Sequence, residues 1–124
     1  MLKLDAIGIV TSDLSACLRF YRLIGVDAPD IDDDHVEATL PNGLRLMFDK
    51  VELVKQITDW IEPVGHRMGL AFLCESPNHV DETCAAITAA GFKVAKEPWD
   101  AFWGQRYAQA EDPDGNLVDL FAPL

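Results

Sequence analysis

The sequence predicts an α+β fold, in which two β-α-β-β-β modules form one curved sheet around a cavity. The order of a strand, a capped helix and a β-hairpin occurs twice along the chain, and Gly25 and Gly91 end the two helices at equivalent places. Both hairpins have a Pro-containing turn, Pro41-Asn42-Gly43 and Pro113-Asp114-Gly115. Neither half covers its own sheet face, so the repeats are expected to pair.

In the first half, LDAIGIV is predicted to be a strand. Ser12 or Asp13 caps a helix with apolar residues at helical spacing from Leu14 to Tyr21. An acidic loop, DAPDIDDD, follows, and a further strand near Val26 remains open at this point. The segments VEATL and LRLMF are predicted to pair across the first hairpin turn.

Residues 51–61 have helical spacing and are predicted to form a connector that ends at Pro63 and Gly65. In the second half, MGLAFLCE is predicted to be a strand, and Ser76 caps the second helix. FKVA is the next expected strand, and RYAQAE and NLVDLF form the last hairpin. The chain is therefore expected to be a single domain, 1–124, with repeats at about 1–50 and 66–124.

The totals are those of an ordinary globular protein. Hydrophobic residues make up 49% and charged residues 25% of the 124, and no apolar run approaches the roughly 20 residues of a membrane span. Lys3 and Asp5 interrupt the N-terminal apolar stretch, so no signal peptide is predicted. We expect a cytoplasmic protein with no membrane partner.

Charge and cysteine content exclude further classes. Ten basic and 21 acidic residues give a net charge of −11, which opposes binding to nucleic acid and to anionic membranes. Cys17, Cys74 and Cys84 are odd in number, widely spaced and set in apolar segments, so they are predicted to be buried free thiols.

The segments IGIVTSDLSACLRFYRLIGV and WGQRYAQAEDPDGNLVDLF make the chain resemble the vicinal oxygen chelate superfamily over essentially its whole length. That superfamily includes glyoxalase I, extradiol dioxygenases and bleomycin-resistance proteins. The last third, PWDAFWGQRYAQAEDPDGNLVDLFAPL, resembles the drug-sequestering branch typified by the mitomycin-binding resistance protein. The resemblance also implies a homodimer, because open sheets expose edges that a second chain can complete.

The resemblance places the four metal-binding positions of the family's enzymes at Ala6, Met47, Gly69 and Asp119. One carboxylate does not hold a divalent ion against hydration, since catalytic sites use about three protein ligands. We therefore expect neither a metal site nor a cofactor, and Asp119 is free for another role. Arg45 is a candidate partner for Asp119, because it lies two residues before Met47 on the same strand face.

Five residues are further candidates for contact with a ligand. Trp103, beside Gly104, can present its ring as a stacking wall, and Trp99 lies in the same predicted loop, although tryptophans are more often core residues. Tyr107 shares strand parity with Trp103 and can orient a ligand through its hydroxyl. The resemblance implies that His35 lies beside the ligand. The flexible thioether of Met47 suits a permissive pocket.

Together these residues predict a metal-independent protein that binds and sequesters a small planar, hydrophobic molecule, aromatic or quinone-like, such as an antibiotic, and so confers drug resistance. No nucleophile-base-acid arrangement and no phosphate-binding loop is present, so a non-enzymatic role is expected. The alternative is a metal-dependent glyoxalase-like lyase or isomerase, or a dioxygenase, of the same superfamily. A structural or protein-binding role is a third possibility.

Overall fold

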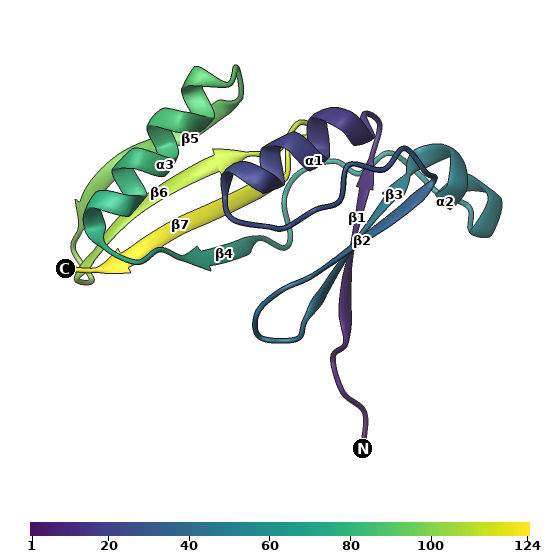
Figure 1. The fold of residues 1–124 in the computed structure, drawn as a ribbon, viewed down its shortest axis with the longest axis horizontal. Helices are drawn as coiled ribbons and strands as arrows, with labels where there is room; N and C mark the ends of the chain where they lie inside the picture. The colour runs from purple at the N-terminus through teal and green to yellow at the C-terminus, as the bar shows by residue number, and fades with distance from the viewer. The chain divides into compact units, whose positions relative to one another are not determined.

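The computed structural model describes residues 1–124, which form two compact units, Met1–Pro63 and Val64–Leu124 (Figure 1). The first unit contains β1 (Ala6–Thr11), α1 (Leu14–Leu23), β2 (His35–Thr39), β3 (Arg45–Lys50) and α2 (Val51–Ile57). The second contains β4 (Leu70–Leu73), α3 (Pro77–Ala89), β5 (Lys93–Ala101), β6 (Gln105–Glu111) and β7 (Leu117–Pro123). The α+β class and the succession of two related modules are confirmed.

In the first unit, β3 lies between β1 and β2, parallel to β1 and antiparallel to β2. Leu46 and Phe48 on β3 are fully buried, and the ring of Phe48 lies 5.3 Å from that of Tyr21 on α1. The helix begins where predicted, because the Asp13 side chain accepts a hydrogen bond of 3.1 Å from the Ala16 amide. One face of the sheet is thus covered by α1.

In the second unit the strands are ordered β4-β7-β6-β5, and α3 packs along one face of the sheet (Figure 1). Ser76 caps α3 by accepting a hydrogen bond from the His79 amide. Buried residues alternate along β6 and β7 and meet the buried side chains Val80, Cys84 and Ile87 of α3. This alternation leaves every second residue of each strand on the face opposite α3.

The first module has three strands, because the chain near Val26 forms none. The Ala28 amide donates to the Val26 carbonyl at 2.9 Å, and the Arg22 guanidinium donates to the carbonyls of Ala28 and Pro29 at 2.9 Å each. Pro29 also has no amide hydrogen to give to a sheet. These bonds take the place of strand pairing, so the modules are β-α-β-β and β-α-β-β-β, each with its own hydrogen-bonded sheet.

The connector helix is shorter than predicted. α2 ends at Ile57, and Thr58 is already extended at φ −146° and ψ 164°, so Pro63 and Gly65 do not end it. The helix buries none of its residues, and Ile57 and Ile61 are 75% and 83% exposed. Without packing of its apolar face, a short helix has little to stabilise further turns.

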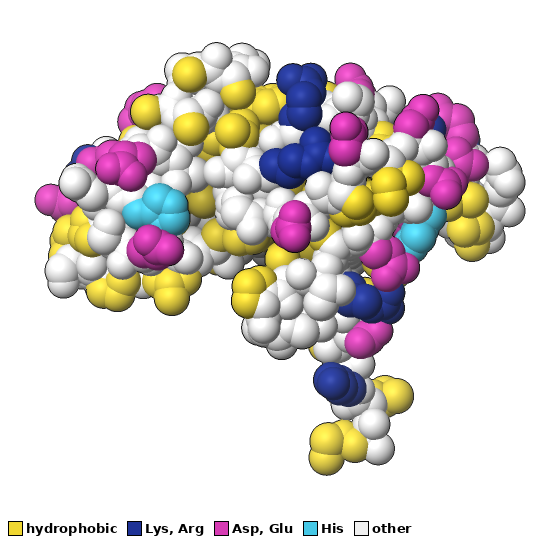
Figure 2. Space-filling view, in the orientation of Figure 1, with side chains coloured by type: hydrophobic (Ala, Val, Ile, Leu, Met, Phe, Trp, Pro, Cys, Tyr) yellow, Lys and Arg dark blue, Asp and Glu magenta, His cyan; other side chains and the backbone are white.

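Both predicted hairpin turns are present, with Gly43 at φ +88° and Gly115 at φ +89°, a region that favours glycine. Cys17, Cys74 and Cys84 are buried free thiols, as predicted. No helix has the length and apolarity needed to cross a bilayer. Figure 2 shows acidic side chains spread over the surface of both units, in keeping with the net charge of −11.

Candidate functional site

The sheet face opposite α3 brings the predicted residues of the second unit together in two rows across the strands. Strand register fixes these rows, because directly paired residues of neighbouring strands point to the same side. The apolar row is Trp99, Tyr107, Phe121 and Leu73, and the polar row is Lys96, Gln109, Asp119 and Ala71. This face therefore offers an apolar row beside a row that carries the hydrogen-bonding side chains of Lys96, Gln109 and Asp119.

Two irregularities in β5 place Trp99 in the apolar row. The register against β6 shifts between Val94 and Lys96 and again between Lys96 and Trp99, so that Trp99 is paired with Tyr107. The prediction that Trp99 lies in a loop was wrong, because β5 continues through the bulges as far as Ala101. Each β-bulge inserts one extra residue, so the side chains beyond it no longer follow the alternation that marks a strand in sequence.

Trp103 lies in the turn between β5 and β6, so the predicted strand parity with Tyr107 was the wrong reason for their proximity. Gly104 has φ +90° in this tight turn, which folds the Trp103 ring back toward the sheet. Its Nε1 donates to Gln105 Oε1 at 2.8 Å, and its ring centroid lies 5.2 Å from that of Tyr107. The structure thus joins Trp103, Tyr107 and Trp99.

These residues and one other form an aromatic cluster, Trp99, Phe102, Trp103 and Tyr107. Trp103 lies 5.6 Å from Trp99 at an interplanar angle of 90°, and 4.9 Å from Phe102 at 88°. An edge-to-face contact covers at most one face of one of its two rings. Phe102 is 90% exposed and was missed by the sequence analysis, although its place in the motif AFWG was a signal for it.

Asp119 interrupts an apolar strand because it belongs to the polar row, where it is hydrogen-bonded to Gln109. Asp119 is half-buried, and its Oδ1 accepts a hydrogen bond of 3.0 Å from Gln109 Nε2, which also donates to the Tyr107 hydroxyl oxygen at 3.2 Å. Burial and hydrogen bonding to Asp119 raise the pKa of Tyr107 to about 12. Tyr107 is therefore a neutral hydrogen-bond donor at physiological pH. Gln109 was not predicted from the sequence, because its contact with Asp119 depends on cross-strand register.

Ultraviolet titration of tyrosine ionisation is expected to show Tyr107 deprotonating near pH 12, and Asp119→Asn is expected to lower that pKa. The folded pKa of Tyr107 exceeds the value of about 10 in the unfolded chain. The contribution of Tyr107 to stability is therefore complete below about pH 10 and is lost as the pH rises through the folded pKa. Tyr107→Phe identifies the signal. An unshifted Tyr107 pKa in Asp119→Asn would contradict the assigned contact.

On the first sheet, the face opposite α1 carries the other three predicted residues, His35, Arg45 and Met47. His35 is the first residue of β2. Its Nδ1 lies 2.5 Å from Asp49 Oδ1 and its Nε2 lies 2.6 Å from Glu37 Oε2. Both contacts raise the pKa of His35, the one with Glu37 most. Both ring nitrogens are thus engaged by carboxylates.

Arg45 has its ion pairs within this face, with Asp5 at 2.7 Å and with Glu37. Met47 points to the side opposite the buried Phe48, because neighbouring residues of a strand alternate between its two faces. The pairing of Arg45 with Asp119 stays a prediction, since the contacts found for each lie within its own sheet.

The residues at the four positions that the resemblance assigns to a metal do not fit a divalent ion. Ala6 and Gly69 have no donor atom, and Met47 offers only a soft thioether. The carboxylate of Asp119 is already hydrogen-bonded to Gln109. No group of three or more His, Cys, Asp or Glu side chains is placed to hold a metal ion.

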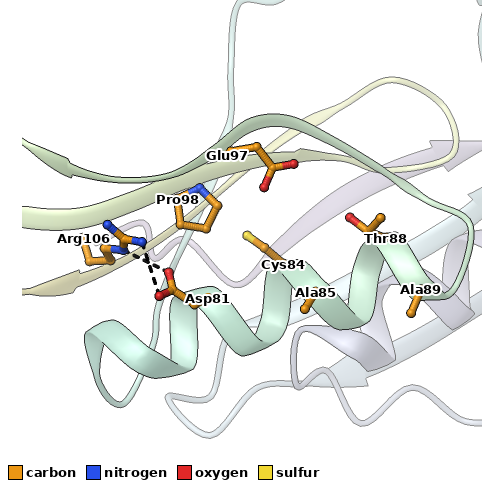
Figure 3. Close-up of a pocket in the computed structure, with 8 residues that line it drawn as sticks. All are labelled: Asp81, Cys84, Ala85, Thr88, Ala89, Glu97, Pro98 and Arg106. Atoms are coloured by element: carbon orange, nitrogen blue, oxygen red, sulfur yellow. Dashed lines mark hydrogen bonds and ion pairs between the residues drawn. The ribbon is translucent and has the colours of Figure 1, made fainter.

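A separate pocket of about 590 Å³ lies between α3 and β5, on the other side of the second sheet (Figure 3). Cys84 points into it, but burial, together with nearby Glu97, raises the pKa of its thiol to about 11, which keeps it protonated and weakly nucleophilic. Arg106 is occupied by ion pairs with Asp81 and Asp100. None of the predicted site residues lines this pocket.

Comparison with known proteins points to one family. The model of the glyoxalase/bleomycin resistance protein/dioxygenase superfamily matches residues 3–120. No curated protein is similar enough in sequence to count as a match.

Solved structures resemble the chain along nearly its whole length. A glyoxalase/bleomycin resistance protein/dioxygenase family enzyme from Burkholderia phytofirmans has a TM-score of 0.85 at 21% identity, covering 99% of this chain and 100% of that one. A glyoxalase-related enzyme from Fulvimarina pelagi also has 0.85, at 20% identity, covering 98% and 88%. A protein from Agrobacterium tumefaciens has 0.75 at 26% identity, covering 100% and 99%.

Proposed function

The chain belongs to the glyoxalase/bleomycin resistance protein/dioxygenase superfamily, and from that premise we propose that it is a metal-independent protein that binds and sequesters a planar small molecule. The ligand is an aromatic or quinone-like compound of the antibiotic kind, and its removal from solution confers resistance. The observation that carries this proposal is the apolar row with the Trp103 ring set edge-on beside it.

The geometry supports a flat ligand. A ring lying over Tyr107 and Phe121 contacts apolar surface on the sheet, and Trp103 supplies a wall at its side. Polar substituents of such a ligand reach Gln109 and Asp119, which lie in the next row. Stacking contributes about 0.5–1.5 kcal/mol beyond burial, so most of the affinity comes from the apolar area removed from water.

The absence of reaction is part of the proposal. At the four family positions only Asp119 carries a hard donor atom, so these positions offer too few ligands for a catalytic metal. The Cys84 thiol has a pKa of about 11, so it is not a thiolate nucleophile at neutral pH. A metal-dependent lyase, isomerase or dioxygenase is the rival function. Stoichiometric metal in protein purified without added metal, or loss of ligand binding on chelation, would favour that rival.

Trp103→Ala is expected to weaken binding of planar compounds about three- to tenfold, because it removes the ring wall of the site. Tryptophan fluorescence titration with mitomycin-, bleomycin- and quinone-type compounds measures the dissociation constants. Trp60→Phe, in the linker after α2, is the matched control and is expected to leave them unchanged.

Equal affinity in Trp103→Ala would remove the stacking model, and recovery of a chemically altered ligand would show that the protein is an enzyme. The same titration on His35→Ala tests whether the first sheet also contributes, as predicted for His35, Arg45 and Met47. A bacterium that expresses the protein should tolerate a higher concentration of the drug that binds best.

We also propose a homodimer, and a monomeric mass in sedimentation at micromolar concentration would exclude it.

A further inference from the structure

We infer that the ligand of this site is an organic cation whose positive centre lies over the ring of Trp99, where the ammonium group of Lys96 now lies. This inference rests on the proposed function, since it names the charge class of the ligand at the same site. Lys96 Nζ is 4.9 Å from the centroid of the Trp99 ring, within the range in which a cation is attracted to an aromatic face.

The Lys96 side chain lies at the place proposed for the ligand's positive centre, and no ion pair holds it there. Its side chain is exposed and has no carboxylate partner, unlike Lys93 on the same strand, which lies 2.7 Å from Glu111. Register places Lys96 in the polar row next to Gln109, on the same face as Trp99. The only contact that holds the ammonium group is therefore the aromatic face that a ligand would use.

The surroundings suit a positive charge more than a neutral group. Trp103 and Phe102 contact Trp99 edge-to-face, at interplanar angles of 90° and 61°, so three aromatic side chains with electron-rich ring faces meet at this place. Asp119, in the same polar row as Lys96, has a neutral amide as its hydrogen-bond donor and no cationic partner. Tyr107 stays uncharged, and the protein as a whole has a net charge of −11.

An organic cation can displace the lysine because the two differ in hydration. A lysine ammonium is compact and strongly hydrated, so it loses much of its interaction with water when it is enclosed. A cation delocalised over a flat ring, or shielded by alkyl groups, is less hydrated and also buries apolar area. Such a ligand gains from both the ring face and Asp119, whereas a neutral analogue of equal shape gains from neither charge interaction.

The test uses 1-methylquinolinium and quinoline, which are similar in shape and differ in charge at pH 8. Calorimetric titration of the full chain is expected to show the cation binding about fivefold more tightly. Lys96→Gln is expected to tighten binding of the cation by a further two- to fivefold, roughly, and to leave quinoline unchanged. Lys93→Gln changes the net charge equally without touching Trp99, so it is expected to have little effect.

Equal affinities for the two probes, with no gain in Lys96→Gln, would overturn the cation assignment and leave the proposed planar-ligand function standing. Equal gains in the Lys96 and Lys93 variants would also overturn it, because long-range charge would then explain the preference. Binding of neither probe, nor of the other planar compounds, would overturn the proposed function itself.

Discussion

Phe48→Ala is expected to lower the free energy of unfolding by about 3–5 kcal/mol. Phe48 is fully buried on β3, the central strand of its sheet, and its ring lies 5.3 Å from Tyr21 of α1. Removing the ring forfeits its burial, its contact with Tyr21 and the packing of α1 on the sheet. Urea denaturation followed by circular dichroism measures the loss.

Met47→Ala is the matched control, since Met47 is the preceding residue of the same strand and points to the opposite face. Met47 is half-buried there, so its truncation is expected to cost less than about 1.5 kcal/mol. Equal losses in the two variants would contradict the assignment of the two sheet faces. That assignment matters for function, because it decides which side of β3 can contact a ligand.

The parts of the fold that sequence predicted correctly depend on neighbours within a few residues. Strand alternation places Met47 and Phe48 on opposite faces, and the caps at Asp13 and Ser76 depend on bonds to amides three residues away. The hairpin turns likewise follow from Pro, Asn and Gly at fixed offsets. The strand near Val26 did not form because Arg22, earlier in the chain, binds the carbonyls that a sheet partner would need.

The sequence indicated which residues make up much of the candidate site, but it did not show how they pair across the strands. Trp99, Tyr107 and Asp119 do lie on one face, but the bulges in β5 decide that Trp99 is paired with Tyr107. Pairing between strands also brings Gln109 to Asp119, and no pattern within either strand reveals it. His35 shows the same dependence, because its partner Asp49 lies on the neighbouring strand, 14 residues along the chain.

The second large effect is expected at Asp112, which begins the turn between β6 and β7. Asp112 is 3% exposed, and its carboxylate accepts hydrogen bonds from the amides of Asp114 and Asn116 at 3.0 and 2.9 Å and from the Asn116 side chain at 2.7 Å. Asp112→Ala leaves these donors without their acceptor, so a loss of about 2–4 kcal/mol is expected. Asp112→Asn keeps an acceptor oxygen and should lose less.

The same variant distinguishes two ways in which the register of β6 and β7 can be set. If the core sets it, Asp112→Ala loses stability but its folded state keeps the raised Tyr107 pKa, because a slip of one residue would turn Asp119 inward and Leu120 outward. We expect this result, since Val118 and Leu120 are almost fully buried against α3. A Tyr107 pKa that returns toward 10 in folded Asp112→Ala would instead show that the turn holds Gln109 and Asp119 together. Tyrosine titration in the folded baseline, with stability measured in parallel, separates the two outcomes.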